Sequence, residues 1–234
     1  MGAAPAPRAV VFDLWNTIAE WPAEAWAEVR PSVAERVGLT LEEFDARWYG
    51  DLAHVREMGP LADALAVIGA SPETSAEILE LRRDVTLQGL EPVPGAGETI
   101  AALRERGLKI GLITVCSEDV PLLWQETAFH GLFDAEVFSC SVGLRKPDPR
   151  IYHLALEQLG VEPGEAVFVG DGANDELAGA ERVGMTAILL ARDDTEVEWA
   201  GRRIRALPEL LNVVAPAMLQ GQSLGHRQND TRSG

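Results

Sequence analysis

Short apolar runs alternate with segments of helical periodicity along most of the chain. The apolar runs predict buried strands over residues 9–12, 108–114, 135–139, 166–170 and 186–190. Between them, apolar residues recur every three or four positions, which predicts helices over residues 98–106, 120–129, 149–159 and 176–183. Strands that alternate with helices are typical of a parallel sheet with right-handed crossovers. The pattern therefore predicts an α/β fold.

One long segment departs from this alternation. Residues 22–88 carry helical periodicity and hardly any strand signal, and Ser71-Pro72 is a typical helix start. We expect a separate helical insert of small-domain size over residues 18–89. The core would then comprise residues 1–17 and 90–217. The polar tail, residues 218–234, is expected to be disordered.

Composition and charge narrow the range of partners. The 234 residues are 47% hydrophobic, enough for a sizeable core, and their formal net charge is -17. This charge argues against nucleic acid or an anionic membrane as the main partner, and an anionic substrate would need local cations. Two cysteines form neither a disulfide framework nor a zinc motif. The sequence shows no membrane-spanning apolar segment, so we expect a cytoplasmic protein. No long heptad repeat indicates an oligomeric state.

Two of the predicted strands end on carboxylates. Asp13 follows the strand at 9–12, and Asp171 follows the strand at 166–170. Ligands of open α/β sheets bind beyond the carboxyl ends of the strands. A single Asp after a strand is more often a turn or a helix cap, but two of them favour one acidic site built from distant parts of the chain. A carboxylate held at a strand end can act as a nucleophile, and we assign that role to Asp13.

Three further residues complete the candidate site. Asp171 and Asp175 are hard oxygen donors that suit Mg²⁺, although Asp175 also fits a helix N-cap. Lys146 precedes a proline, so its backbone is extended, and its loop can present one ammonium to the carboxylates and to an incoming anion. Thr114 ends a strand, where its hydroxyl can bind a phosphoryl oxygen; an ordinary strand threonine is the alternative.

Together these segments resemble the haloacid dehalogenase superfamily, over residues 9–17 and roughly 90–192. The matching motifs are Phe12-Asp13-x-x-x-Thr17, Thr114, Lys146 in Arg-Lys-Pro-Asp-Pro, and Gly170-Asp171-Gly172-x-x-Asp175. The resemblance implies a Rossmann-like core with an inserted α-helical cap, as in the first subclass of the superfamily. It also implies Mg²⁺-dependent hydrolysis of a small phosphorylated metabolite through an aspartyl-phosphate.

The resemblance also implies roles for individual residues. Asp13, Thr114 and Lys146 would be catalytic. Asp13, Asp171 and Asp175 would bind the metal together with the backbone carbonyl of Trp15. Thr17, Trp15 and Asn16 would contact the substrate.

Trp15 is the main departure from the family pattern. Phosphatases of the family carry an Asp there that protonates the leaving group, and an indole cannot do this at neutral pH. Dehalogenases of the family carry an aromatic residue at this position, so a metal-independent 2-haloacid dehalogenase is an alternative. Gly170-Asp171-Gly172 resembles the metal-binding form of the family's fourth motif, which argues against a metal-independent dehalogenase. A non-catalytic scaffold that binds a phosphorylated ligand or a protein partner is the third hypothesis.

The insert contributes aromatic and basic candidates whose roles stay open. Trp15, Trp21 and Trp26 occur near its start, where they either pack the hinge or form an aromatic wall for substrate. Three arginines within it either bind a substrate anion or lie on solvated helix faces: Arg30, Arg47 and Arg56.

Overall fold

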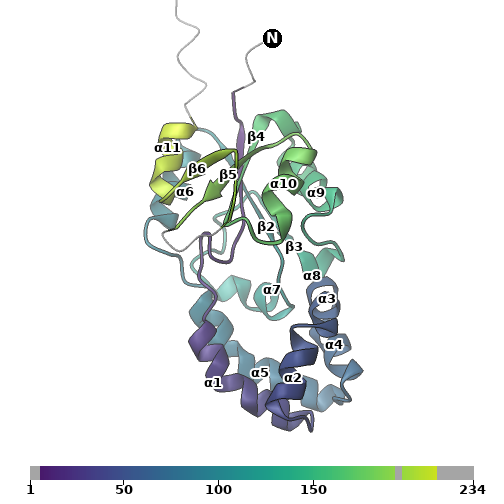
Figure 1. Ribbon diagram of the computed structural model, residues 1–234. Helices are drawn as coiled ribbons and strands as arrows, with labels where there is room; N and C mark the ends of the chain where they lie inside the picture. The colour runs from purple at the N-terminus through teal and green to yellow at the C-terminus, as the bar shows by residue number, and fades with distance from the viewer. Residues whose placement is uncertain (1–5, 193–196, 215–234) are drawn as a thin grey trace, which may run out of the picture.

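The computed structural model describes residues 6–192 and 197–214, so the predicted tail lies outside the described residues. A six-stranded parallel sheet runs through the larger part of the molecule in the order β3-β2-β1-β4-β5-β6 (Figure 1). The strands are β1 (Ala9–Phe12), β2 (Lys109–Thr114), β3 (Ala135–Phe138), β4 (Ala166–Gly170), β5 (Thr186–Leu190) and β6 (Arg202–Ile204). The predicted α/β fold is confirmed.

Helices cover both faces of the sheet because its central strand is apolar on both sides. Val10 and Phe12 of β1 pack in one core with Ile100 and Leu103 of α6 (Ala96–Glu105). Ala9 and Val11 face the other core, which α9 (Pro149–Leu159) and α10 (Glu176–Arg182) complete. Alternate residues of β1 thus pack against helices on opposite faces of the sheet, and this packing fixes β1 at the centre of the sheet.

A helical unit lies at one end of the sheet and has its own hydrophobic core (Figure 1). Ser71 caps the last and longest of its helices, since its hydroxyl accepts a hydrogen bond from Thr74 N (3.1 Å), as predicted from the sequence. The helices are α1 (Ala23–Arg36), α2 (Leu41–Trp48), α3 (Asp51–Met58), α4 (Leu61–Val67) and α5 (Pro72–Gly89). All of them fall within the predicted insert, whose precise limits stay a prediction.

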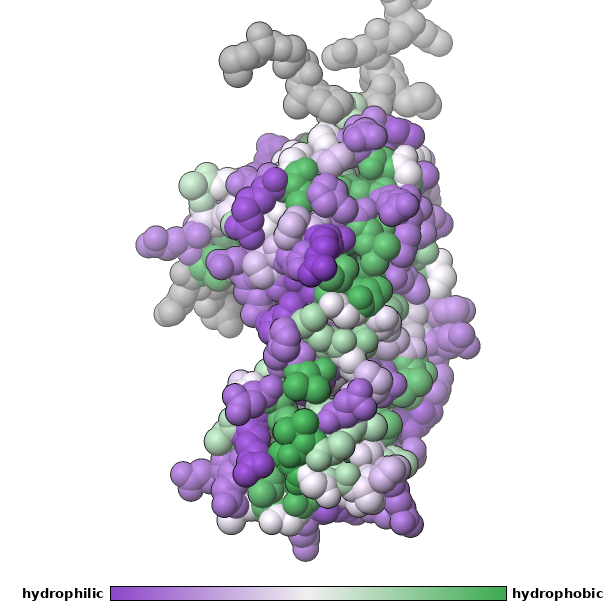
Figure 2. Space-filling model, turned by 90° about the vertical axis from the view of Figure 1, so that its right-hand side faces the viewer, coloured by the Kyte–Doolittle hydropathy of each residue, from purple (hydrophilic) through white to green (hydrophobic). Residues whose placement is uncertain are grey.

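Two chain segments connect the helical unit to the sheet and lie side by side. Val93 N donates a hydrogen bond to Ile18 O (2.9 Å), and Ala19 pairs with Pro92 as an isolated antiparallel bridge. Figure 2 shows that the surface is indented between the two parts of the molecule. The indentation and the paired segments mark the place where the insert joins the core.

The short elements near the strand ends differ from the predictions. The helix predicted over 120–129 is shorter: α7 (Asp119–Leu123) passes into a 3-10 turn that ends at Glu126. The sequence analysis missed α8 (Ser139–Val142), α11 (Leu210–Val213) and β6, because elements of three or four residues are too short to show a period. Among the described residues, no helix is both long and apolar enough to cross a membrane.

Candidate active site

Asp13 is fixed directly beyond the carboxyl end of β1. Its backbone N–H donates to Val169 O of β4 (2.8 Å), which continues the sheet pairing by one residue. The side chain is buried, and Thr17 Oγ1 donates a hydrogen bond to Asp13 Oδ2 (3.1 Å). Thr17, expected to contact substrate, therefore contacts the candidate nucleophile and orients its carboxylate.

Lys146 is the cation of the site. Its ammonium is buried, and it forms ion pairs with the carboxylates of Asp13 and Glu176. Burial alone would lower the pKa of Lys146, but the charges of these two carboxylates outweigh it and raise the pKa. Lys146 also lies over the ring of Phe168, 5.5 Å from its centroid. Lys146 is therefore a permanent positive charge beside the candidate nucleophile.

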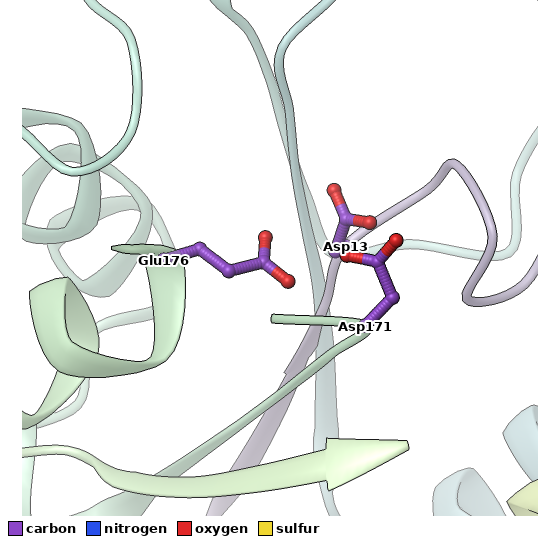
Figure 3. A group of neighbouring side chains, drawn as sticks. All are labelled: Asp13, Asp171 and Glu176. Carbon is purple, nitrogen blue, oxygen red and sulfur yellow. The ribbon is translucent and has the colours of Figure 1, made fainter. Parts of the chain in front are cut away.

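Three carboxylates meet at this point. One oxygen from each of Asp13, Asp171 and Glu176 lies within 4.8 Å of the others. Figure 3 shows the three side chains converging from separate elements, the ends of β1 and β4 and the start of α10. Burial, followed by the charge of Asp13, raises the pKa of Glu176 to about 8, and burial also raises the pKa of Asp13. One ammonium does not neutralise this cluster, so the site favours a further cation.

Glu176 is the site residue that the sequence analysis missed. Asp175, the predicted metal ligand, is exposed and lies outside the three-carboxylate cluster, while Glu176 is 1% exposed. Asn174 and Asp175 both adopt positive φ (54° and 55°), and this left-handed turn carries the chain past the site before α10 begins. The available signal was the helical period, since Glu176 shares its buried side with Leu177 and Ala180.

Trp15 and Asn16 form part of the wall of a cavity of ≈ 260 Å³. Asp13, Lys146, Asp171 and Glu176 also line this cavity. Asn16 has a positive φ (56°), and its Nδ2 donates to Asp171 Oδ2 (3.3 Å). We refer to this space as the catalytic cavity.

Thr114 lies at the end of β2, fully buried, as expected. Its hydroxyl has no hydrogen-bond partner among the described residues. A buried polar group without a partner is costly, so an unpaired hydroxyl at a strand end beside the site is consistent with a ligand contact.

A second cavity of ≈ 220 Å³ adjoins the first, because Trp15, Trp21 and Val115 line both. Trp15 packs edge-on against Trp21, with ring centroids 5.3 Å apart. The second cavity extends into the helical unit, where α2, α3 and α5 contribute to its wall. A larger cavity of ≈ 590 Å³ lies near the junction with the insert, but its lining includes none of the predicted site residues.

The aromatic and basic candidates of the insert separate in the structure. Trp26 packs in the core of the helical unit with Phe44 and Trp48. Trp21 packs against the edge of the same core, whereas Trp15 packs against a core of the sheet. Arg30 pairs with Asp45 (3.3 Å) and Arg47 is exposed. Of the three arginines, Arg56 lines the second cavity, together with Arg82, which the sequence analysis did not single out.

Comparison with known proteins identifies the same family that the sequence motifs resemble. The family model for "haloacid dehalogenase-like hydrolase" matches residues 7–184. The chain is 32% identical over 200 residues to a glyceraldehyde 3-phosphate phosphatase of Methanopyrus kandleri, covering 79% of this chain and 84% of that protein. It therefore belongs to the haloacid dehalogenase-like hydrolases.

Solved structures of the family share the fold. A phosphatase of the family from Thermococcus onnurineus superposes with a TM-score of 0.71 at 25% identity, covering 89% of this chain and 98% of that one. A 2-haloacid dehalogenase from Pseudomonas syringae superposes with a TM-score of 0.68 at 24% identity and the same coverage, which shows the common fold alone. The fold is therefore shared by enzymes named for two different reactions.

Proposed function

We propose that this hydrolase is a Mg²⁺-dependent phosphatase that acts on a small phosphorylated metabolite. The observation that carries the proposal is the convergence of Asp13, Asp171 and Glu176 around a single ammonium, that of Lys146. The matching relative named a glyceraldehyde 3-phosphate phosphatase supports a phosphate ester as substrate.

The donor set suits a hard divalent cation. Mg²⁺ prefers carboxylate and carbonyl oxygens and usually binds one or two carboxylates, leaving positions for water and phosphate. Asp13, Asp171 and the backbone carbonyl of Trp15 would hold the ion, with Glu176 in place of Asp175. When bound, the ion would offset the negative charge of the phosphoryl group.

The residues of the chain account for the other parts of the reaction. The Asp13 carboxylate that Thr17 orients attacks phosphorus, forming an O–P bond while the ester O–P bond breaks and the leaving oxygen departs. Lys146 stabilises the charge of the transferred group, and the unpaired hydroxyl of Thr114 donates to a phosphoryl oxygen. Water then hydrolyses the aspartyl-phosphate, releasing phosphate and restoring Asp13.

The leaving oxygen needs a proton that Trp15 cannot supply. The indole N–H is a donor only and does not ionise at neutral pH. General acid–base help is typically worth about 10²–10⁴ in rate. The enzyme would therefore favour phosphorylated compounds with good leaving groups, such as acyl phosphates or aryl phosphate esters, or would use water as the acid.

A 2-haloacid dehalogenase is the second candidate, because Trp15 is aromatic and Asp13 is equally suited to attack carbon. Three clustered carboxylates oppose it, since a metal-independent enzyme has no use for them around its nucleophile.

Release of inorganic phosphate from a panel of metabolite phosphates and from p-nitrophenyl phosphate tests the proposal, with Mg²⁺ or EDTA and with Asp13→Asn as control. We expect release that needs Mg²⁺ and is lost in the variant. Turnover that persists in EDTA, or halide release from chloroacetate, would contradict the proposal. Binding of phosphate esters without any turnover would favour the non-catalytic scaffold.

A further inference from the structure

The two cysteines of the chain meet beside the candidate active site. The Sγ atoms of Cys116 and Cys140 lie 3.9 Å apart, although the residues are 24 positions apart along the chain. Both thiols are free and buried. Thr114 of β2 pairs with Phe138 of β3 in the sheet, and each cysteine lies two residues beyond its paired strand end. The pairing of β2 with β3 thus brings together two thiols whose spacing along the chain matches no disulfide framework.

The backbones of the two cysteines are also held close to one another. Ser139 Oγ accepts a hydrogen bond from Cys116 N (3.0 Å) and donates one to Cys116 O (3.3 Å). Ser139 directly precedes Cys140 at the start of α8. A disulfide has an S–S distance of about 2.05 Å, so the two sulfur atoms would approach by about 2 Å on oxidation. Formation of this bond therefore requires a movement of the two segments and not their unfolding.

Cys140 is the more reactive thiol of the pair. A hydrogen bond from the Cys116 thiol lowers the pKa of Cys140, whereas burial, followed by the contact with Cys140, raises the pKa of Cys116. Cys140 is also the more exposed of the two (8% against 3%). Because the thiolate is the form that reacts with peroxides, oxidation would begin at Cys140, and Cys116 would be the resolving thiol.

The dithiol pair lies between two residues of the proposed reaction. Thr114 precedes Cys116 by two residues, and Lys146 follows Cys140 by six. Val115, between Thr114 and Cys116, lines both cavities, and Cys116 itself lines the second one. A movement of the two cysteines toward each other would therefore shift the segments that carry Thr114 and Lys146.

We propose that Cys116 and Cys140 form a reversible oxidation site, at which a peroxide closes a disulfide that lowers the hydrolytic activity. The Cys140 thiolate attacks one oxygen of hydrogen peroxide, the O–O bond breaks, and the leaving hydroxide takes up the proton that Cys140 had released. Cys116 then attacks the sulfenic sulfur of Cys140, so that the S–S bond forms, the S–O bond breaks, and water leaves with the Cys116 proton. The two sulfur atoms lose two electrons, and the peroxide is reduced to two water molecules.

A count of free thiols tests the disulfide, and turnover tests its effect. The protein is treated with hydrogen peroxide, and free thiols are counted with a maleimide after denaturation. We expect both thiols to be lost together, without a crosslinked dimer on a non-reducing denaturing gel. Mg²⁺-dependent phosphate release should fall at least about tenfold, since small displacements of catalytic groups have effects of up to about 10²-fold. Dithiothreitol should restore both the thiols and the activity by thiol–disulfide exchange.

Single substitutions separate the disulfide from other oxidative damage. Cys140→Ser should keep the basal activity and resist peroxide, because the remaining thiol has no partner within the chain. Cys140→Ala is the second variant, in case a hydroxyl is poorly tolerated at this buried position. Cys116→Ser should accumulate a sulfenic acid at Cys140, which dimedone labels.

Three results would overturn the inference: two thiols that survive peroxide, a disulfide form with full activity, or equal inactivation of Cys140→Ser and the unmodified protein. The effect on turnover rests on the proposed phosphatase function, but the thiol count does not. A disulfide in a protein that releases no phosphate from any ester would reject the phosphatase function and keep the oxidation site. Phosphate release that peroxide leaves unchanged would do the reverse.

Discussion

The carboxylate of Glu176 occupies the space that a side chain on Gly170 would need. A Cβ atom built on Gly170 would lie 1.9 Å from Glu176 Oε1 and 2.6 Å from its Cδ. Glu176 also accepts a hydrogen bond from Gly172 N (3.1 Å) and pairs with Lys146, so it cannot move aside freely. The glycine that ends β4 is thus required by the buried carboxylate six residues later.

Gly170→Ala should displace Glu176 from Lys146 and from the carboxylate cluster. We expect kcat/KM to fall by about 10²-fold or more, since small displacements of catalytic groups have effects of this size, together with weaker Mg²⁺ dependence. Gly97→Ala is the matched control, because a Cβ there meets no atom within 4 Å and the residue lies inside α6. That control should retain activity and gain up to about 1 kcal/mol of stability. A fully active Gly170→Ala enzyme would exclude Glu176 from the site.

Asp13→Asn and Lys146→Met should both abolish activity and yet affect stability in opposite ways. Asp13→Asn removes one negative charge from a crowded cluster and leaves Lys146 paired with Glu176, so the free energy of unfolding should stay within about 1 kcal/mol of the unmodified protein. Lys146→Met leaves two buried carboxylates without a cation and should cost about 3–5 kcal/mol. Urea unfolding of both variants measures the difference. Equal losses would contradict the charge arrangement described here.

The buried pair between Arg82 and Asp119 should make stability depend on pH in the acid range. Burial alone would raise the pKa of Asp119, but Arg82 and the hydroxyls of Ser117 and Thr86 outweigh it and lower the pKa. A lowered folded-state pKa adds stability above the unfolded value of about 3.9, and this stability is lost as the pH falls through the folded value.

Asp119→Asn should therefore cost about 3–5 kcal/mol at pH 7, and its difference from the unmodified protein should shrink below about pH 4. Asp45→Asn, which breaks a half-buried pair with Arg30, serves as control with an expected loss of about 0–1 kcal/mol. Free energies of unfolding of both variants and the unmodified protein, measured between pH 3 and pH 7, test this pH dependence. A difference that does not change with pH would show that Asp119 does not titrate with folding.

Gly89→Ala should disturb the junction between insert and core. A Cβ on Gly89 would lie 2.6 Å from Pro22 Cδ and 3.1 Å from Trp15 Cζ3. Because Trp15 lines both cavities, its displacement should change KM as well as lower stability by about 1–3 kcal/mol. Thermal unfolding and steady-state kinetics check both effects. If KM is unchanged while stability falls, Trp15 does not contact the substrate.

The sequence predicts the sheet well and the site in part, for a physical reason. Strands such as Ala166–Gly170 are buried on both faces, so their apolar runs are unmistakable, and five strands start and end within one residue of the predicted limits. Asp13 and Asp171 follow such strands directly, and their positions can therefore be read from the pattern.

Glu176 and Arg82 could not be found in the same way. Both are buried charged residues on helices, and a sequence shows neither which partner neutralises them nor that a left-handed turn at Asn174 and Asp175 shifts the inward-facing carboxylate by one position. Their importance depends on Lys146 and Asp119, which lie 30 and 37 residues away along the chain. Such pairs are set by tertiary packing.

The position of β1 has a consequence for how the protein folds. The chain reaches Ala9–Phe12 before any other strand described here, yet this wholly apolar strand ends at the middle of the sheet, between β2 and β4. Its partners begin at Lys109 and Ala166, so one edge stays open until β2 has been synthesised and the other until β4 has been synthesised. Pairing over such sequence distances is slow and leaves an aggregation-prone edge exposed. The helical insert precedes both partners in the chain and has time to fold first, and Asp13 at the end of β1 reaches its final position only when β4 pairs with β1.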